Sequence, residues 1–463
     1  MAHTDDQPDA PDGAPIEQQL YAIRQTIQTR AVHGVFANWR VAMVLITQLV
    51  YYGLPWLQWD DRQAVLFDLA SRKFYIFGLV FWPQDFVYLT GLLILAALAL
   101  FLFTAVAGRL WCGYACPQTV YTEIFMWVEQ WLEGDHVARK KLDAAPWSAN
   151  KLKKRGAKHL VWFAIALWTG FTFVGYFTPI QTLAAEVMTW TLGPWESFWI
   201  VFYAFATWGN AGFMREQVCK YMCPYARFQS VMFDSDTLTV TYDTSRGEPR
   251  GARGKKIDFR AQGLGACVAG IDIRNGLQYE CIGCAACIDG CDQIMDKMGY
   301  PRGLIRYTTE NVVKGKYPDS GILRHVLRPR TILYSVIMLV IGSAFVVSLA
   351  TRVPLRVDVV RDRVALSKET DEGLIENVYR LQLINKDGRA HRYTIEAEGI
   401  PGLQVVTSQA EISAAPLQTV DIPVSLVADP VELKGRSIEV QFIVRAVDAP
   451  EIVDEVKTKF FNR

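Results

Sequence analysis

The sequence predicts a multidomain integral membrane protein with five transmembrane α-helices, a cytoplasmic ferredoxin-like segment and a C-terminal all-β immunoglobulin-like sandwich. Three observations support this fold class. Several apolar stretches have the roughly 20 residues that a bilayer requires. Cysteines from Cys281 to Cys291 have the spacing C-x2-C-x2-C-x3-C, which is typical of ferredoxins. Residues from about Leu355 to Arg463 alternate between apolar and polar side chains, as strands do.

Five stretches are predicted to span the membrane, and tryptophan and tyrosine lie near their ends, as at membrane interfaces. They are Val41–Leu57, Phe86–Ala107, Leu160–Phe177, Phe198–Phe213 and Ile332–Ala350. The apolar pattern is strongest in the second and the fifth stretch. Gln48 and Pro55 weaken it in the first, and Asn210 weakens it in the fourth. No basic segment followed by an apolar run opens the chain, so we predict no cleavable signal peptide.

The distribution of lysine and arginine predicts the orientation. Both are frequent in 109–158 and 215–330 and rare in 58–85 and 178–197. Since basic loops stay in the cytoplasm, we expect a protein of the bacterial inner membrane with a cytoplasmic N-terminus and a periplasmic C-terminus. All nine cysteines then lie on the reducing side or at its membrane edge, which favours metal ligands or redox groups over disulfides. The formal net charge of +1 gives no reason to expect nucleic acid.

These features divide the chain into five predicted parts. They are a cytoplasmic tail (1–36), a four-helix membrane region (37–216), the ferredoxin-like segment (217–329), the fifth transmembrane helix (330–352) and a periplasmic immunoglobulin-like domain (353–463). About seven short strands, with a turn at Asn385–Gly388, predict the sandwich. This domain shows no catalytic constellation, so we interpret it as a docking module or a spacer. The six histidines show no metal-ligand spacing, and we interpret them as surface or interfacial residues.

A pair of cysteines follows the second span, and a matching pair follows the fourth. The segments are RLWCGYACPQTVY and REQVCKYMCPYARF, each with the pattern C-x3-C-P after an arginine. They indicate a duplicated two-helix unit. Residues four apart lie on one face of a helix, and the proline that follows breaks the helix or begins a new one. If the two units pack about a pseudo-two-fold axis, Cys112, Cys116, Cys219 and Cys223 meet at the cytoplasmic membrane face. Such thiolates suit copper, but they could also join a cluster, cycle to a disulfide or fill the core as small apolar groups.

The second cysteine motif predicts an iron–sulfur site. Cys281, Cys284, Cys287 and Cys291 have the spacing of a 4Fe-4S ligand set, whereas zinc sites more often show two separated C-x2-C pairs. In two-cluster ferredoxins, the fourth cysteine of each motif binds the cluster of the other motif. The number of clusters therefore depends on whether a partner motif precedes this one.

The upstream partner motif retains only Cys267. Ile257, Arg260 and Gly263 stand where its other three cysteines would be. We therefore expect one 4Fe-4S cluster, held by Cys267 and the first three cysteines of the second motif, with Cys291 left over. The alternative is that Cys291 closes the cluster and Cys267 is not a ligand.

Four segments together resemble the FixG/CcoG family of cytochrome oxidase accessory proteins. They are WCGYACPQTVYTEIFMWVE, CKYMCPYARFQSVM, GIDIRNGLQYECIGC and MDKMGYPRGLIRYTTEN. The resemblance covers the chain apart from the N-terminal tail. It implies a role in assembling the cbb-type haem–copper oxidase, with reduction of Cu(II) to Cu(I) during copper delivery. The chain departs from this family at the first ferredoxin motif, where members usually have a full set of cysteines and two clusters.

The sequence leads to three functional hypotheses. The first is a cupric reductase, in which a 4Fe-4S cluster passes electrons to a copper ion at Cys112, Cys116, Cys219 and Cys223. Its expected partners are a copper chaperone or transporter, assembly factors of the cbb-type oxidase, an electron donor that the sequence does not identify, and the lipid bilayer. The second hypothesis is a membrane quinol dehydrogenase. The third is a non-catalytic assembly scaffold in which the cluster is structural.

Overall fold

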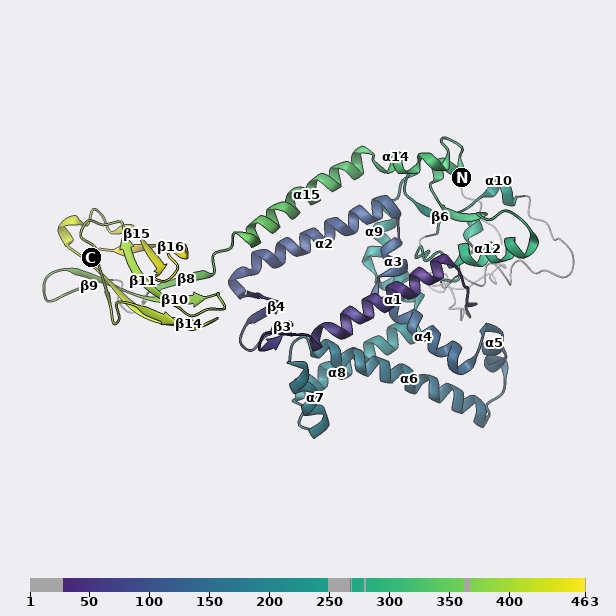
Figure 1. Cartoon of the computed structure of the whole chain (residues 1–463), viewed down its shortest axis with the longest axis horizontal. Coiled ribbons are helices and arrows are strands. Elements are labelled where there is room, and N and C mark those ends of the chain that lie inside the picture. Colours follow the sequence, from purple (N-terminus) through teal and green to yellow (C-terminus); the bar gives the residue numbers. More distant parts are fainter. Residues whose placement is uncertain (1–27, 249–266, 268, 279, 362–366, 463) are drawn as a thin grey trace, which may run out of the picture. The chain divides into compact units, whose positions relative to one another are not determined.

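The computed structural model describes residues 28–248, 267, 269–278, 280–361 and 367–462 (Figure 1). Most of the predicted N-terminal tail and the positions Ile257, Arg260 and Gly263 lie outside these residues. The chain forms two compact units, Met1–Ile341 and Gly342–Arg463, whose boundary falls within helix α15. Each unit is described by itself.

Each of the five predicted spans coincides with helix. The helices are α1 (Val35–Gly53), α2 (Phe86–Ala107), α6 (Ala149–Val174), α8 (Pro194–Thr207) with its π-helical continuation η4 (Trp208–Met214), and α15 (Pro329–Ala350). Within the part of the chain that the structure describes, three helical segments are long and apolar enough to cross a membrane by length and composition: Pro83–Ala107, Ala149–Val174 and Pro329–Ala350. The crossing of a membrane stays a prediction for all five helices, and α8 has only 14 residues before its π-helical turn.

Short strands and a helix occupy the connections on one side of these helices. Strands β1 (Gln58–Trp59) and β2 (Arg62–Gln63) precede a sheet of β3 (Val65–Asp68), β4 (Lys73–Ile76) and β5 (Leu79–Phe81). The buried Gln63 amide donates to the Gly175 carbonyl and accepts from the Ile180 backbone N–H at the start of α7 (Ile180–Thr189). This connection is therefore fixed to the end of α6.

The repeated cysteine motifs lie at the opposite ends of these helices. The first repeat continues as α3 (Leu110–Tyr114) and α4 (Pro117–Glu133), and the second continues as the π-helix η5 (Val218–Met222) and α9 (Pro224–Met232). Helix α5 (His136–Ala144) connects α4 to α6, and α4 packs beside α6 (Figure 1).

The ferredoxin-like segment has a small core of its own. Strands β6 (Thr239–Tyr242) and β7 (Ile305–Thr308) pair antiparallel, and α12 (Ala286–Met298) packs against β7. The remaining short elements are α10 (Thr244–Gly247), η7 (Ile273–Asn275), α13 (Glu310–Val313), η8 (Asp319–Gly321) and α14 (Ile322–Val326). The buried side chains of this core are Val240, Tyr242, Ile273, Ala285, Ile288, Cys291, Met295 and Ile305. The core thus holds the helix that carries the cysteine motif.

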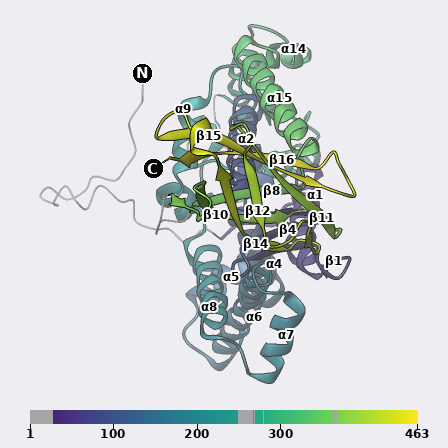
Figure 2. The same ribbon diagram turned by 90° about the vertical axis from the view of Figure 1, so that its left-hand side faces the viewer.

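The C-terminal unit is a sandwich of two antiparallel sheets (Figures 1 and 2). One sheet has the order β12-β14-β10-β8, with β9 also paired to β10, and the other has the order β13-β11-β15-β16. The strands are β8 (Leu355–Arg361), β9 (Lys368–Glu369), β10 (Ile375–Asn385), β11 (His391–Glu398), β12 (Gln404–Thr407), β13 (Ile412–Ala414), β14 (Thr419–Ala428), β15 (Ser437–Ala446) and β16 (Val453–Phe461). The predicted turn at Asn385–Gly388 is where the chain crosses from one sheet to the other.

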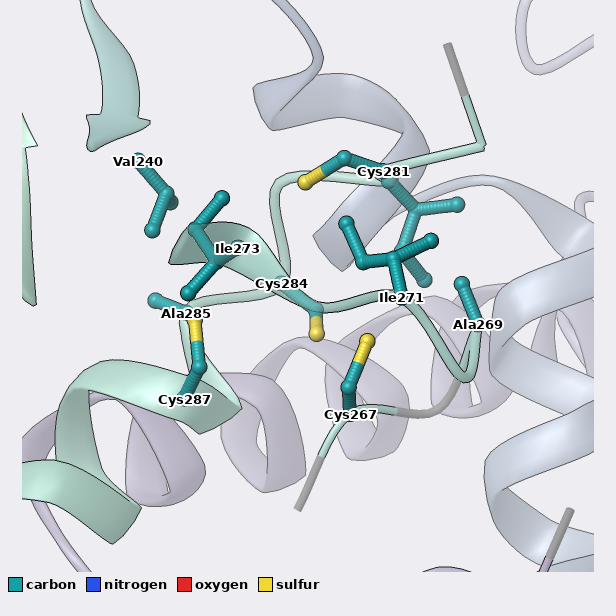
Figure 3. Close-up of a pocket in the computed structure, with 10 residues that line it drawn as sticks. Val240, Cys267, Ala269, Ile271, Ile273, Cys281, Cys284, Ala285 and Cys287 are labelled. Carbon is teal, nitrogen blue, oxygen red and sulfur yellow. The ribbon is translucent and has the colours of Figure 1, made fainter. Parts of the chain in front are cut away.

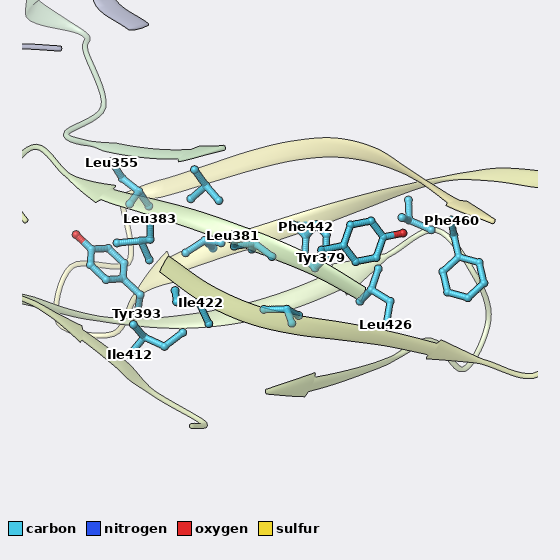
Figure 4. Close-up of a cluster of buried hydrophobic side chains, with 14 of the residues drawn as sticks. Leu355, Tyr379, Leu381, Leu383, Tyr393, Ile412, Ile422, Leu426, Phe442 and Phe460 are labelled. Carbon is cyan, nitrogen blue, oxygen red and sulfur yellow. The ribbon is translucent and has the colours of Figure 1, made fainter. Parts of the chain in front are cut away.

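Packing and hydrogen bonds hold this sandwich together without a disulfide. The ring centroids of Tyr379 and Phe442, from opposite sheets, lie 5.4 Å apart in an edge-on arrangement within the core (Figure 4). The Asn377 side chain donates to the Phe461 carbonyl at 2.9 Å and accepts from the Phe461 N–H at 2.8 Å. Because β10 and β16 belong to different sheets, this reciprocal pair connects the two layers.

His391 is buried rather than a surface residue, which corrects the sequence-based interpretation. Its Nδ1 lies 2.7 Å from Asp448 and its Nε2 lies 2.9 Å from Asp387. Burial lowers the pKa of the imidazole, but the hydrogen bonds with Asp387 and Asp448 outweigh it, and the pKa is raised. His391 is the only histidine of the C-terminal unit.

We expect the C-terminal unit to lose stability as the pH rises above neutral. A histidine with a raised folded-state pKa stabilises fully below its unfolded pKa of about 6.5, and this contribution is lost as the pH passes through the folded pKa. The measurement is the melting temperature of residues 353–463 from pH 5.5 to 9, with His391→Gln as the comparison. The variant should melt lower at pH 5.5 and show a flatter pH profile. Equal profiles would contradict the ion pairs.

Candidate functional site

Four cysteines line one cavity in the ferredoxin-like segment. They are Cys267, Cys281, Cys284 and Cys287. The cavity has a volume of about 430 Å³, counted to its open mouth, and its other lining residues are Val240, Ala269, Ile271, Ile273, Ile282 and Ala285. In Figure 3 the sulfur atoms of Cys267 and Cys284 point toward each other from two different segments of the chain. Among the described residues that line the cavity, none has a carboxylate, imidazole or amide side chain. The four cysteines predicted to hold the 4Fe-4S cluster therefore line the same cavity, which we call the cluster site.

Local backbone geometry explains how the loop before α12 presents its cysteines. Gly283 and Ala285 have φ values of +67° and +58°, so the chain turns sharply on both sides of Cys284. The Tyr307 hydroxyl, from β7, donates to the Gly283 carbonyl. A Cβ atom at Gly283 would lie 3.3 Å from the Arg109 carbonyl oxygen, so only glycine combines this φ with this close approach. The loop is therefore fixed from both sides.

The donor set of this cavity fits a 4Fe-4S cluster. Burial raises the pKa of Cys267 to about 12 and raises the pKa of Cys281 and of Cys287 as well. Without iron these thiols keep their protons at neutral pH, and metal binding must expel them. Among the described residues, no three Cys, His, Asp or Glu side chains converge on a single ion position. Four thiols spread around an apolar cavity instead suit a polynuclear cluster.

Cys291 is not among the residues that line this cavity. It lies on α12, is 7% exposed and packs in the apolar core with Ile288, Met295 and Ile305. Burial raises the pKa of its thiol to about 11. Its surroundings are those of a small apolar side chain rather than of a ligand.

The two C-x3-C-P motifs adopt matching backbone conformations. Cys116 donates its backbone N–H to the Trp111 carbonyl, and Cys223 donates to the Val218 carbonyl, in both cases five residues back. Four residues before each first cysteine the backbone has the same unusual conformation, with φ/ψ of 53°/−110° at Gly108 and 42°/−111° at Arg215. These parallels support a structural duplication.

The four-residue spacing suggested that the two cysteines of each pair share one helical face, but they do not lie on one continuous helix. Cys112 belongs to α3 and Cys219 to η5, but Cys116 and Cys223 are the N-cap residues of α4 and α9. The proline that follows each N-cap begins the new helix, because a ring without an N–H is tolerated at this first position. A break between two helices therefore separates the thiols of each pair.

The repeats bind each other reciprocally. After the motif proline comes Gln118 in the first repeat and Tyr225 in the second. Gln118 donates its amide to the carbonyls of Asn210 and Arg215, near the end of the second repeat's membrane helix. Tyr225 donates to the Leu100 carbonyl of α2, the corresponding helix of the first repeat. This exchange of equivalent contacts is the expectation for a pseudo-two-fold axis.

The contacts between the two repeats place Cys112, Cys116, Cys219 and Cys223 close to one another. Cys112 interacts electrostatically with Cys116 and Cys219, and Cys223 interacts with Cys116 and Cys219. Burial raises the pKa of Cys112 to about 12 and that of Cys219 to about 11. Among the described residues, these thiols do not converge on one ion position, and neither do the thiols of Cys267, Cys281, Cys284 and Cys287. We call Cys112, Cys116, Cys219 and Cys223 the membrane-edge thiols.

The membrane-edge thiols lie directly beside the loop that carries Cys281 and Cys284. Cys112 and Cys219 pack in one apolar cluster with Ile282, Cys284 and Ala286. A Cβ atom at Gly113, the residue after Cys112, would lie 2.9 Å from the Ile282 carbonyl oxygen and 3.0 Å from the Cys284 Cα. Because Gly113 has no side chain, the backbone of α3 can pack directly against the backbone of the cysteine loop at Ile282 and Cys284.

Arg109, at the start of α3, connects this helix to the cysteine loop and to α9. Its buried guanidinium donates to the carbonyl of Cys281 at 3.1 Å and to that of Ala226, on α9, at 2.7 Å. Its charge opposes the rise in pKa of Cys112, Cys219 and Cys281. Arg215 does not act in the same way, because its guanidinium pairs with Glu129 at 2.8 Å.

Replacing Arg109 by methionine is expected to lower the reduction potential of the iron–sulfur centre. A nearby positive charge stabilises the reduced state, and losing about 1 kcal/mol of such interaction shifts a one-electron potential by on the order of 50 mV. Redox titration followed by electron paramagnetic resonance measures the shift. Arg227→Met removes an exposed cation from α9 and is the matched control. Equal potentials in both variants would contradict the role of Arg109.

Two glutamates that follow the first cysteine pair are more buried than a solvated helix face would be. Glu129 is 6% exposed and pairs with Arg139, Lys158 and Arg215. Glu123 pairs with Arg40 of α1. Sequence reasoning missed this network because its cations come from α1, α5, α6 and the end of η4. Only the helical spacing of the glutamates was visible in the sequence.

The fold and the cysteine sites together define an iron–sulfur protein with membrane-type helices and an immunoglobulin-like C-terminal domain. Family models agree with the iron–sulfur and the immunoglobulin-like parts. Residues 89–142 match a 4Fe-4S binding domain, residues 214–310 match a 4Fe-4S dicluster domain, and residues 345–463 match the IG-like fold at the C-terminal of FixG, putative oxidoreductase.

Curated relatives identify the family. The chain is 40% identical to Protein RdxA of Cereibacter sphaeroides over 84% of this chain and 86% of that protein. It is 38% identical to Nitrogen fixation protein FixG of Rhizobium meliloti over 84% of this chain and 82% of that protein. A crystal structure of a FixG-related protein from Vibrio parahaemolyticus is 29% identical, with a TM-score of 0.22, over 24% of this chain and 97% of that chain. The chain belongs to the FixG family.

Proposed function

We propose that this chain is a membrane electron-transfer protein that reduces Cu(II) to Cu(I) at the membrane-edge thiols. The observation that carries the proposal is the contact between two cysteine sites of different kinds. Cys267, Cys281, Cys284 and Cys287 would hold a 4Fe-4S cluster, which exchanges single electrons when bound. Gly113 and Arg109 connect its loop to Cys112 and Cys219.

Copper is proposed as the substrate because of the donor chemistry of the membrane-edge thiols. Thiolates are soft ligands that favour Cu(I), so their presence makes the reduction of Cu(II) more favourable. Each Cu(II) takes up one electron, and the soft product stays bound until an acceptor removes it. Because the thiols do not converge in the described arrangement, copper binding requires their side chains to rotate.

A second candidate function is supported by the family models. Residues 89–142, whose only cysteines are Cys112 and Cys116, match a 4Fe-4S binding domain. The membrane-edge thiols would then hold a second iron–sulfur cluster, and the chain would be an electron carrier without copper chemistry. Cys291 alone would be left over from the nine cysteines.

The topology and partners complete the proposal. The basic segments favour a cytoplasmic N-terminus and a periplasmic C-terminal domain with five spans in the bacterial inner membrane. Cys267 and the membrane-edge thiols then face the cytoplasm. A copper chaperone or transporter would receive Cu(I), and assembly factors of a cbb-type oxidase are the proposed wider context.

Anaerobic reduction of Cu(II) by the purified, dithionite-reduced protein tests the proposal. A Cu(I)-specific chelator should report stoichiometric Cu(I) in the wild-type protein and none in the Cys112→Ser/Cys116→Ser variant. Cys291→Ser is the control, because this thiol lies in an apolar core away from both sites. Copper reduction that is equal in all three proteins would contradict the proposal. Extra iron at the membrane-edge thiols, without copper reduction, would favour the second candidate.

A further inference from the structure

An apolar cavity lies on the other side of α3 from the cysteine sites. Its walls come from α1, α2, α3 and the strand β7, and it encloses about 1130 Å³ counted to its open mouth. Aromatic side chains dominate its lining: Phe36, Trp39, Phe103, Trp111, Tyr114 and Tyr307. None of the described residues that line it carries a charged side chain. An occupant must therefore be apolar and is expected to contain an aromatic or quinoid ring.

The mouth of this cavity faces outward among membrane-type side chains. Three of the lining residues, Trp39, Phe103 and Trp111, are 61%, 51% and 45% exposed. Further along the same helices, Leu45 and Leu49 of α1 and Leu92 and Leu93 of α2 are exposed as well. Helices α1 and α2 both pack against α3 (Figure 1). A molecule dissolved in the bilayer can reach such a cavity, whereas a water-soluble donor would have to cross an apolar mouth.

Two of the elements that line the cavity, α3 and β7, also contact the cysteine sites. Trp111 and Tyr114 line the cavity from one face of α3, and Cys112 and Gly113 face the cysteine sites from the same short helix. The Tyr307 hydroxyl donates to the Gly283 carbonyl, between Cys281 and Cys284. The Asp289 carboxylate of α12 accepts the Ala37 N–H at 2.7 Å and so holds the start of α1. An occupant is therefore placed next to the cysteine loop.

The two tyrosines provide polar contacts in an otherwise apolar cavity. The Tyr307 hydroxyl donates to the Gly283 carbonyl. The Tyr114 hydroxyl, on α3, can donate or accept one hydrogen bond toward an occupant of the cavity. A hydroxyl or carbonyl group on a ring ligand would supply that partner. A plain acyl chain would leave the Tyr114 oxygen without that partner.

We propose that this cavity binds the ring of a membrane quinone or quinol, which would be the electron donor of the protein. This inference rests on the proposed function, because it supplies the reductant that copper reduction requires. Quinol oxidation to quinone releases two electrons and two protons, and the proposed electron acceptor is the iron–sulfur centre of the neighbouring loop. Two Cu(II) ions are reduced per quinol.

Photolabelling with an azidoquinone tests the site independently of electron transfer. The full chain is placed in quinone-free lipid nanodiscs, illuminated and mapped by mass spectrometry. We expect labelled peptides from α1 and α3, and we expect a short-tailed quinone to compete but a fatty acid not to compete. Labelling elsewhere, or equal competition by the fatty acid, would overturn the proposal and indicate a lipid-chain cavity instead.

Three variants sharpen the test. Ala107→Trp fills the cavity and should reduce labelling by about tenfold or more, whereas Leu93→Trp places the same bulk on the exposed face of α2 and should change nothing. Tyr114→Phe keeps the shape, loses one hydrogen bond and should weaken quinone binding by about fivefold. Undiminished binding in Ala107→Trp and Tyr114→Phe would contradict the site.

The outcomes separate this inference from the proposed function. Dithionite-reduced protein that reduces Cu(II) but is not labelled would overturn the quinone site and leave copper reduction standing. Specific labelling of α1 and α3 in a protein that never reduces Cu(II) would support the quinone site and contradict copper reduction.

Discussion

Cys267→Ser is expected to lose the iron–sulfur cluster of the ferredoxin-like segment, whereas Cys291→Ser is expected to retain it. Cys267 lines the cavity with Cys281, Cys284 and Cys287, while Cys291 packs in the core with Ile288. Since a 4Fe-4S cluster needs four thiolates, the first variant should lose about four iron atoms and the associated visible absorbance. Iron analysis and low-temperature electron paramagnetic resonance on anaerobically reconstituted protein measure the difference.

The paired variant makes this prediction specific. Cys291→Ser places a hydroxyl in an apolar core, so it should cost stability, of the order of 1–3 kcal/mol, without changing the iron content. Cluster loss in Cys291→Ser, with a stable cluster in Cys267→Ser, would show that the motif closes on itself. That result would reverse the ligand choice and leave Cys267 as the small apolar residue.

The sequence predicted which cysteines gather but not how they do so. The register of the surviving motif pointed to Cys267 because ferredoxin ligands follow a fixed spacing. The duplicated motifs predicted that Cys112 and Cys219 meet, and the structure brings them together. Their backbone was predicted in part: the proline after each pair indicated a helix break or a new helix start, and α4 and α9 begin there. That Cys116 and Cys223 are themselves the N-cap residues became visible only in the structure.

Features built from distant segments were the ones that the sequence did not reveal. The aromatic cavity combines Phe36, Phe103 and Tyr307, and the ion pairs of Glu129 combine three separate elements. His391 is paired with Asp448 across the sandwich. Periodicity reports the local environment of a helix or strand, whereas such groupings depend on how the elements pack. The alternation of the C-terminal unit was a local signal, and its sandwich was therefore predictable.

Replacing Cys112 and Cys116 together by serine is expected to abolish metal binding at the membrane-edge thiols while the first cluster remains. Both cysteines interact with Cys219, so the double variant leaves only one pair of thiols. The equivalent variant of the second repeat, Cys219→Ser/Cys223→Ser, should give the same loss, because the two repeats present their cysteines in the same way. Bound Cu(I) and iron per chain are the quantities to measure.

The two metals distinguish the candidate functions in this experiment. Loss of Cu(I) with unchanged iron is expected if the thiols are the copper site, because soft thiolates are then its main ligands. Loss of about four iron atoms from a wild-type content of about eight is expected if they hold a second cluster. Unchanged copper and iron in both double variants would show that the four thiols do not act together. They would then be apolar packing residues beside Ile282, as buried free cysteines often are.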